Sequence, residues 1–222
     1  MLAAPPSSEL PKNKQMTNDL KEEYKNILEK HLDGRTIKED KITSWMNNIL
    51  EDAKEYFVKK YQDYDLFLYV YVCPRTVYFY SYTSSISVTN TDWSDSVTFI
   101  TDSLYSCLYF FFYKHYELKY EIKEENEIAK KGNEILRKYL QERKYGKECD
   151  KYNQYINNEY SSFVMNKVKN PRCYLLGEIY ENLEGSKYYY NYLSHGKNII
   201  SKIIQTYDND SLTCFFNIFF FK

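Results

Sequence analysis

The stretch TIKEDKITSWMNNILEDAKEYFVKKYQDYDLFLYVYVC, residues 36–73, joins one helix pattern directly to one strand pattern. Thr36 and Glu39 have the spacing of a capping box, in which each side chain bonds a free backbone amide at the start of a helix. From Leu66 to Cys73 the residues are β-branched, aromatic or apolar without interruption, as in a buried strand. Between these two signals, the apolar positions recur every three or four residues, as on one face of a helix: Ile42, Trp45, Met46, Ile49, Ala53, Tyr56 and Phe57, followed by Lys60.

Further elements are predicted on both sides of this stretch. Before it, apolar residues with helical spacing end at Gly34, which supplies the left-handed residue that commonly stops a helix: Leu20, Tyr24, Ile27, Leu28 and Leu32. After it, strand patterns occupy residues 76–88, 96–101 and 104–113. The predicted class is therefore α+β, with two N-terminal helices packed on a four-stranded antiparallel sheet within residues 17–116.

The two ends of the chain differ from this domain. Residues 1–16 carry three prolines and are expected to form a disordered lead-in. Residues 117–222 predict a charged, helical or low-complexity extension without a second core, in which residues 174–183 and 198–207 are compatible with helices. The Phe-rich run at 214–221 either packs on the domain or comes from a read-through into non-coding sequence.

Composition disfavours several classes of function. With only 6 Gly in 222 residues, phosphate-cradling loops are not expected, and a net charge of −1 disfavours nucleic-acid binding. The longest apolar runs are shorter than the roughly 20 residues of a membrane-spanning helix, which predicts a soluble protein. The three His residues and five Cys residues lie far apart, so no catalytic residue, cofactor or metal site is expected: His31, His115, His195, Cys73, Cys107, Cys149, Cys173 and Cys214.

The strand pattern at residues 76–88 is longer than the usual strand of about five or six residues. A strand that projects beyond its hairpin partner leaves backbone amides and carbonyls that must be paired, covered or bent away. Two interpretations remain open. The strand is bulged or bent, or it pairs with a second copy of the chain and accepts an extended peptide at the sheet edge.

Two segments resemble the Tctex-type light chains of dynein. The first is KNILEKHLDGRTIKEDKITSWMNNILEDAKEYFVKKYQDYDLFLYVYVCP, residues 25–74, and the second is DWSDSVTFITDSLYSCLYFFF, residues 92–112. The resemblance covers about residues 20–114 and lies in the order, length and pattern of the elements. It departs at Ile86-Ser87-Val88, where the family has an aromatic residue followed by Asp, at the short Pro74-Arg75 turn, and in residues 117–222, which have no counterpart.

This resemblance implies a non-catalytic adaptor. The second strand of each subunit would join the sheet of the other in a strand-swapped homodimer, and a segment of the dynein intermediate chain would add as a further strand. The expected cellular place is cytoplasmic or axonemal dynein on microtubules, with cargo proteins as further partners and no nucleic acid or membrane. The expected pairing residues are Val77, Tyr78, Phe79, Tyr80, Ser81, Tyr82, Thr83 and Ser84. Two alternatives remain: a stand-alone interaction module that uses its C-terminal helices, and a small α+β enzyme.

Overall fold

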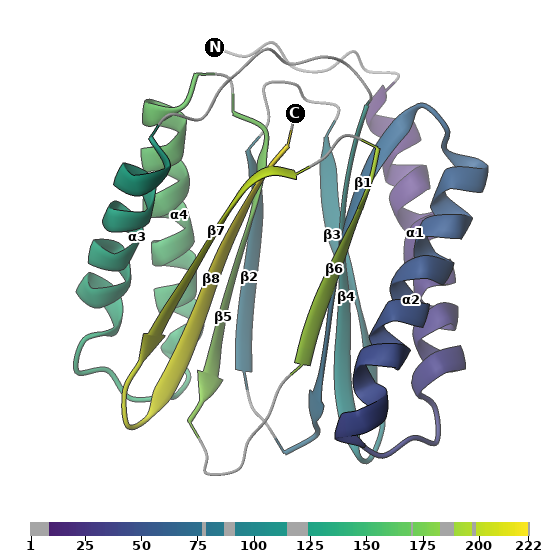
Figure 1. The fold of residues 1–222 in the computed structure, drawn as a ribbon, viewed down its shortest axis with the longest axis horizontal. Helices are drawn as coiled ribbons and strands as arrows, with labels where there is room; N and C mark the ends of the chain where they lie inside the picture. The colour runs from purple at the N-terminus through teal and green to yellow at the C-terminus, as the bar shows by residue number, and fades with distance from the viewer. Residues whose placement is uncertain are drawn as a thin grey trace. The chain divides into compact units, whose positions relative to one another are not determined.

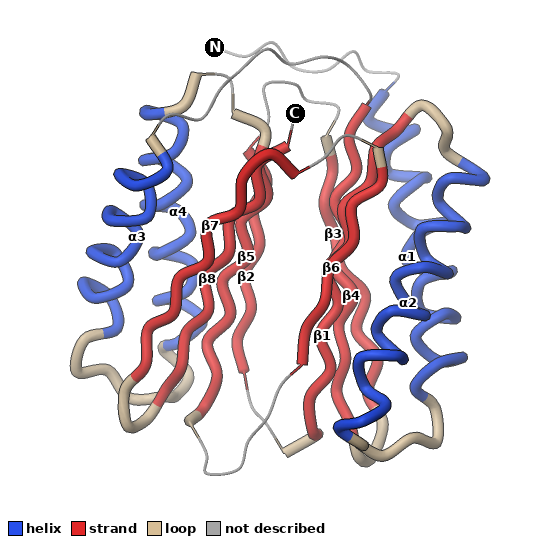
Figure 2. The backbone as a smooth tube through the Cα atoms, viewed as in Figure 1, coloured by secondary structure: helices blue, strands red, loops and turns tan. Residues whose placement is uncertain are grey.

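The computed structural model describes residues 9–76, 79–86, 92–114, 124–169, 171–182, 189–196 and 199–221. In this part of the chain, four helices and two antiparallel four-stranded sheets form an α+β fold, which confirms the predicted class (Figures 1 and 2). The chain divides into two units. Unit 1 comprises Met1–Thr76, Thr89–Tyr116 and Lys187–Lys197, and unit 2 comprises Val77–Val88, Glu117–Ser186 and Asn198–Lys222.

Unit 1 contains the two helices and three of the four strands that the first half of the sequence predicts. Its sheet has the strand order β3-β4-β1-β6. The predicted first helix begins earlier than expected, at Glu9, so residues 9–16 are helical. The elements are α1 (Glu9–Leu32), α2 (Glu39–Lys60), β1 (Tyr64–Pro74), β3 (Trp93–Ile100), β4 (Leu104–Lys114) and β6 (Tyr189–His195).

The core of unit 1 lies between its helices and one face of its sheet. All five apolar positions predicted for the first helix are buried, and α2 buries Trp45, Ile49 and Phe57 among others. These side chains pack on Leu66, Leu68 and other residues of the sheet. The opposite face of β1 is also buried, and this explains why its run LFLYVYV shows no polar alternation.

Unit 2 repeats this arrangement with one strand from residues 79–86 of the predicted domain and with five elements from the predicted extension. Its sheet has the order β2-β5-β8-β7. Its core is formed by apolar residues of both helices together with Leu175, Ile179, Phe216 and Ile218 of the sheet. The elements are α3 (Glu125–Leu140), α4 (Cys149–Lys167), β2 (Phe79–Ile86), β5 (Cys173–Glu181), β7 (Ile199–Asp208) and β8 (Leu212–Phe221).

Two expectations for residues 117–222 therefore need correction. The two segments compatible with helices form β5 and β7 over their described residues, because short apolar runs do not distinguish a helix from a buried strand. The Phe-rich run lies in β8, which pairs with β5 on one side and β7 on the other. Helices α3 and α4 and strands β5, β7 and β8 thus supply a second core, in contrast to the expected extension without one.

The two halves of the chain exchange their second strands. Each half has the order helix, helix and four strands. Strand β2 belongs to the first half but pairs with β5 in unit 2, and β6 belongs to the second half but pairs with β1 in unit 1. The expected four-stranded meander within residues 17–116 is therefore replaced by a sheet in which β1 pairs with β4 and β6. No described helix is long and apolar enough to cross a membrane.

Candidate functional site

The residues expected to pair with a partner strand lie on β2, at one edge of the unit 2 sheet. Val77 and Tyr78 fall outside the described residues, and for Phe79 and Ser84 the structure describes only the backbone. Tyr80, Ser81, Tyr82 and Thr83 are all partly exposed, and they lie opposite Ile179, Glu178, Gly177 and Leu176 of β5. The six expected residues that the structure describes, 79–84, thus lie together on one edge strand.

The direction of each backbone group of β2 follows from the hydrogen bonds at the end of the neighbouring hairpin. Asn182 N–H donates to Ser211 O over 3.0 Å, and in an antiparallel ladder such bonded pairs recur at every second residue. The even-numbered residues of β5 therefore direct their N–H and C=O groups toward β8, and the odd-numbered ones, including Gly177, toward β2. By the same alternation, the backbone groups of Tyr80 and Tyr82 face β5, while Ser81 and Thr83 direct theirs to the outer edge of β2. This edge is open in the sense that no described strand pairs with it.

Helix α4 holds β2 in place through two buried asparagines. Asn153 Nδ2 donates to Tyr80 O over 3.1 Å and to Gly177 O over 2.8 Å, and Asn157 Nδ2 donates to Tyr82 O over 3.4 Å. A Cβ at position 177 would overlap Asn153 Oδ1 and lie 3.0 Å from the Phe216 ring. Gly177 is therefore the residue that lets the Asn153 amide reach both strands.

Replacement of Asn153 by alanine is expected to lower the free energy of unfolding by about 1–3 kcal/mol, because a buried amide that bonds two strands is lost. Urea denaturation followed by circular dichroism measures this change. Gln154→Ala is the matched control, since its amide bonds only Asp150, one turn away on the same helix. Its expected loss is below about 0.5 kcal/mol. Equal losses in the two variants would contradict this role of Asn153.

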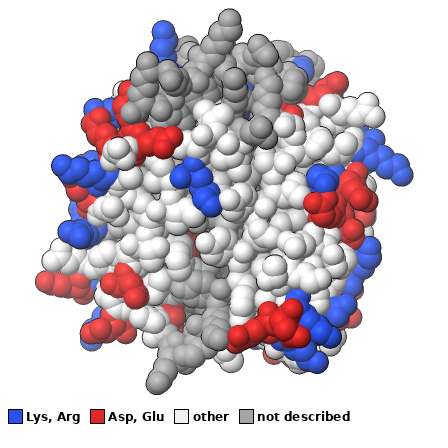
Figure 3. Space-filling model, in the orientation of Figure 1, with Lys and Arg blue, Asp and Glu red and all other residues white. Residues whose placement is uncertain are grey.

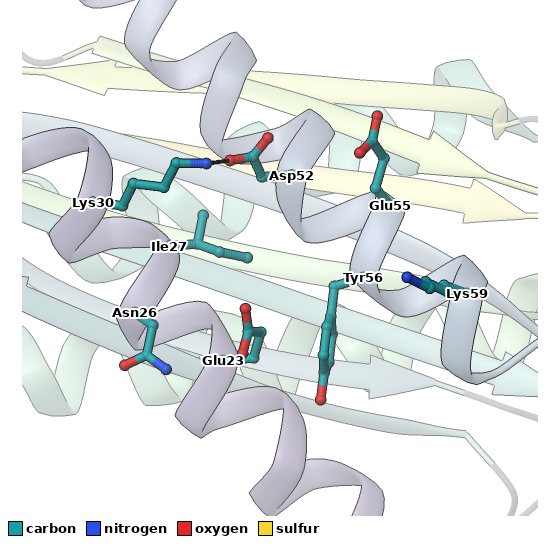
Figure 4. Close-up of a pocket in the computed structure, with 8 residues that line it drawn as sticks. All are labelled: Glu23, Asn26, Ile27, Lys30, Asp52, Glu55, Tyr56 and Lys59. Atoms are coloured by element: carbon teal, nitrogen blue, oxygen red, sulfur yellow. Dashed lines mark hydrogen bonds and ion pairs between the residues drawn. The ribbon is translucent and has the colours of Figure 1, made fainter.

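A second candidate is a groove of about 580 Å³ between α1 and α2 (Figure 4). Asp52 lies at one end of the lining, where its Oδ2 is 2.7 Å from both Lys30 Nζ and His31 Nε2. Burial raises the pKa of Asp52, but the hydrogen bonds from Lys30 and His31 outweigh it and hold this pKa below its ordinary value. The remaining lining residues are of mixed charge: Glu23, Asn26, Ile27, Glu55, Tyr56 and Lys59. Lys30 and Asp52 thus neutralise one another, and because acidic and basic residues both line the groove, it does not select a ligand of one charge.

The other chemically reactive residues are the cysteines and the remaining histidines. All five cysteines are buried as free thiols, and burial raises the pKa of Cys173 and Cys214. His31 bonds Asp52, His195 lies in β6, and His115 falls outside the described residues. In the described ranges, no group of three or more His, Cys, Asp or Glu residues could hold a metal ion.

Charged side chains of both signs are interspersed on the face of the molecule that Figure 3 shows, and neither sign forms a continuous patch on it. This distribution agrees with the formal net charge of −1. A scan against models of protein families finds no match for this chain, and a search of curated proteins finds no related sequence.

Sequence reasoning missed Asn153, Asn157 and the second exchanged strand. The available signal was the repetition of the element order, since Ile128, Ile135, Leu136 and Leu140 have helical spacing and precede a long apolar strand, as in the first half. Because the two halves differ in sequence, this repetition is visible only as a pattern of elements.

Proposed function

We propose that this protein is a non-catalytic adaptor of the Tctex-type dynein light-chain kind. The open edge of β2 accepts an extended segment of the dynein intermediate chain as an added strand. One observation supports this assignment most directly: the second strand leaves the sheet of its own half and forms an edge of the other sheet. This is the exchange that the resemblance to the family implies.

The exchange expected between two copies takes place here between the two halves of one chain. A single chain therefore supplies both exchanged strands, and we propose that the working unit is one chain in place of a homodimer. Its proposed location is a cytoplasmic or axonemal dynein on microtubules, with cargo proteins as further partners.

A stand-alone module that binds through its C-terminal helices ranks second. The apolar residues that α3 and α4 would present to such a partner, including Ile128, Leu136 and Ile156, are already buried in the core of unit 2. Tyr155 and Met165 of α4 are exposed, but Tyr155 packs on the Tyr139 ring of α3. The helix surface that remains offers less to a partner than the β2 edge does.

Thr83→Pro is expected to weaken binding of the intermediate-chain segment at least tenfold, because it removes a backbone N–H that faces the open edge of β2. The fold should persist, since proline is tolerated on an edge strand where its missing N–H would face solvent. The affinity is measured by isothermal titration calorimetry, with the dynein intermediate-chain segment that Tctex-type light chains bind as the titrant.

Ser94→Pro is the control for this experiment. Ser94 lies on β3, an edge strand of the other sheet, and its backbone groups also face away from the sheet. Binding should be unchanged in this variant. Failure of the unmodified protein to bind the segment, or equal loss of binding in both variants, would refute the proposed function.

A further inference from the structure

We infer that the two exchanged strands differ as docking edges: the described residues leave the outer edge of β2 open at Ser81 and Thr83, whereas the side chain of Asn191 closes the outer edge of β6. One chain would then bind a single partner strand, at β2. If both exchanged strands had open edges, one chain would bind two partner strands. The identity of the partner strand rests on the proposed function. The closure of the β6 edge can be tested without any partner.

A hydrogen bond at the turn-side ends of β1 and β4 shows which backbone groups of β6 face outward. Arg75 N–H donates to Ser103 O over 3.1 Å, so the odd-numbered residues of β1 direct their backbone groups toward β4 and the even-numbered ones toward β6. Val70 lies opposite Asn191. Asn191 therefore faces β1, and its neighbour Tyr192 directs its N–H to the outer edge.

That outward N–H already has an acceptor. Tyr192 N–H donates to Asn191 Oδ1 over 2.9 Å, and Asn191 Nδ2 in turn donates over 2.6 Å to Oδ1 of Asn47 on α2. The helix thus fixes the amide that occupies the edge. A partner strand at β6 would have to displace this side chain before it could bond Tyr192.

The other edge of the same sheet is closed in a similar way. Thr101 N–H donates to Leu104 O over 2.9 Å, so Ser96 of β3 directs its N–H outward. This N–H donates to Oδ1 of the preceding residue, Asp95, over 2.8 Å. Asp95 Oδ2 in turn lies 2.9 Å from Lys21 Nζ on α1. Each edge of the unit 1 sheet therefore has an Asx side chain that bonds the next amide and is itself bonded to a helix.

Strand β2 has no such side chain before its outward residues. Ser81 and Thr83 follow Tyr80 and Tyr82, which have no side-chain carbonyl that could accept the next N–H. Asn153 and Asn157 bond β2 on its inner side, at carbonyls that face β5. The device that closes the β6 edge is thus missing at these positions of β2.

Hydrogen exchange on the full chain without any partner tests the closure. The amide of Tyr192 should exchange more slowly than those of Ser81 and Thr83. In Asn191→Val, which keeps a strand-favouring residue but lacks the acceptor, Tyr192 should exchange roughly 3- to 10-fold faster. Asn191→Asp retains the acceptor oxygen for Tyr192, and its second carboxylate oxygen can accept from Asn47 Nδ2 once the Asn47 amide has turned over. It is the matched control, with protection near that of the unmodified chain. Unchanged protection of Tyr192 in the Val variant would overturn the closure.

Calorimetry with the intermediate-chain segment tests the consequence for binding. The unmodified chain and Asn191→Asp should each bind one segment, and Asn191→Val should bind two. Two segments on the unmodified chain, or only one on Asn191→Val, would overturn the inference while leaving the proposed function intact. Absence of all binding would remove the proposed function, and the exchange measurement would still decide whether the β6 edge is closed.

Discussion

Replacement of Gly132 by leucine is expected to lower the free energy of unfolding by about 3 kcal/mol or more, because it forces a side chain into a filled and polar part of the unit 2 core. A Cβ at this position of α3 would overlap both Gln205 Oε1 and the Tyr160 hydroxyl. The Tyr160 hydroxyl donates to Ile128 O over 2.8 Å, and Gln205 Nε2 donates to Ala129 O. Displacing these side chains breaks hydrogen bonds that tie α3 to α4 and to β7.

Gly146 provides the control for this change. It lies in the same unit, between α3 and α4, and a Cβ there would meet no atom within 4 Å. Gly146→Ala is expected to change the free energy of unfolding by less than about 1 kcal/mol, with a small gain because alanine restricts the unfolded chain. Urea denaturation measures both variants. A Gly132 variant as stable as the Gly146 variant would contradict the packing described around α3.

Tyr82→Pro is expected to cost about 3 kcal/mol or more and to detach β2 from the unit 2 sheet. Tyr82 lies opposite Gly177 and directs its N–H toward β5, so proline removes a hydrogen bond of the ladder and its ring occupies the space between the two strands. Detachment of β2 also moves the carbonyl of residue 82 away from Asn157 Nδ2, which donates to it in the unmodified chain. Thermal unfolding followed by circular dichroism measures the loss.

Thr83→Pro separates this effect from a general intolerance of proline in β2. Because the N–H of Thr83 faces the open edge, the expected cost is below about 1.5 kcal/mol. A reversed order, with Thr83→Pro the less stable variant, would show that the assignment of inward and outward groups in β2 is inverted. The two neighbouring positions thus test the direction of the backbone groups on which the proposed binding depends.

The sequence predicted those parts of the fold that depend on local pattern. The helical spacing of Ile42, Trp45 and Ile49 reflects one face of α2 turned toward a core, and these residues are buried. The apolar run of β1 predicted a buried strand for a similar reason. Both signals are confined to one element and its own neighbours along the chain.

The exchange could not be predicted in this way. Strand β2 pairs with β5, which begins about 90 residues further along, and the choice between the two sheets depends on long-range contacts such as those of Asn153. The segment that forms β7 was compatible with a helix because polarity does not alternate along it: Ile200 and Ile204 are exposed, whereas Gln205 is buried. The candidate edge was found because the long strand pattern is itself a local feature.

The reciprocal exchange of β2 and β6 also determines when each sheet can be completed during translation. The unit 1 sheet lacks its last strand until β6 has left the ribosome, although the rest of that unit ends at Tyr116. Strand β2 is made early and must wait for β5 before it has any partner in the described sheets. A nascent chain therefore exposes the sheet edge that awaits β6 and the unplaced strand β2 while the intervening residues are made, at about 5–20 residues per second. The unit 1 sheet cannot be completed before β6 is made, nor the unit 2 sheet before β8.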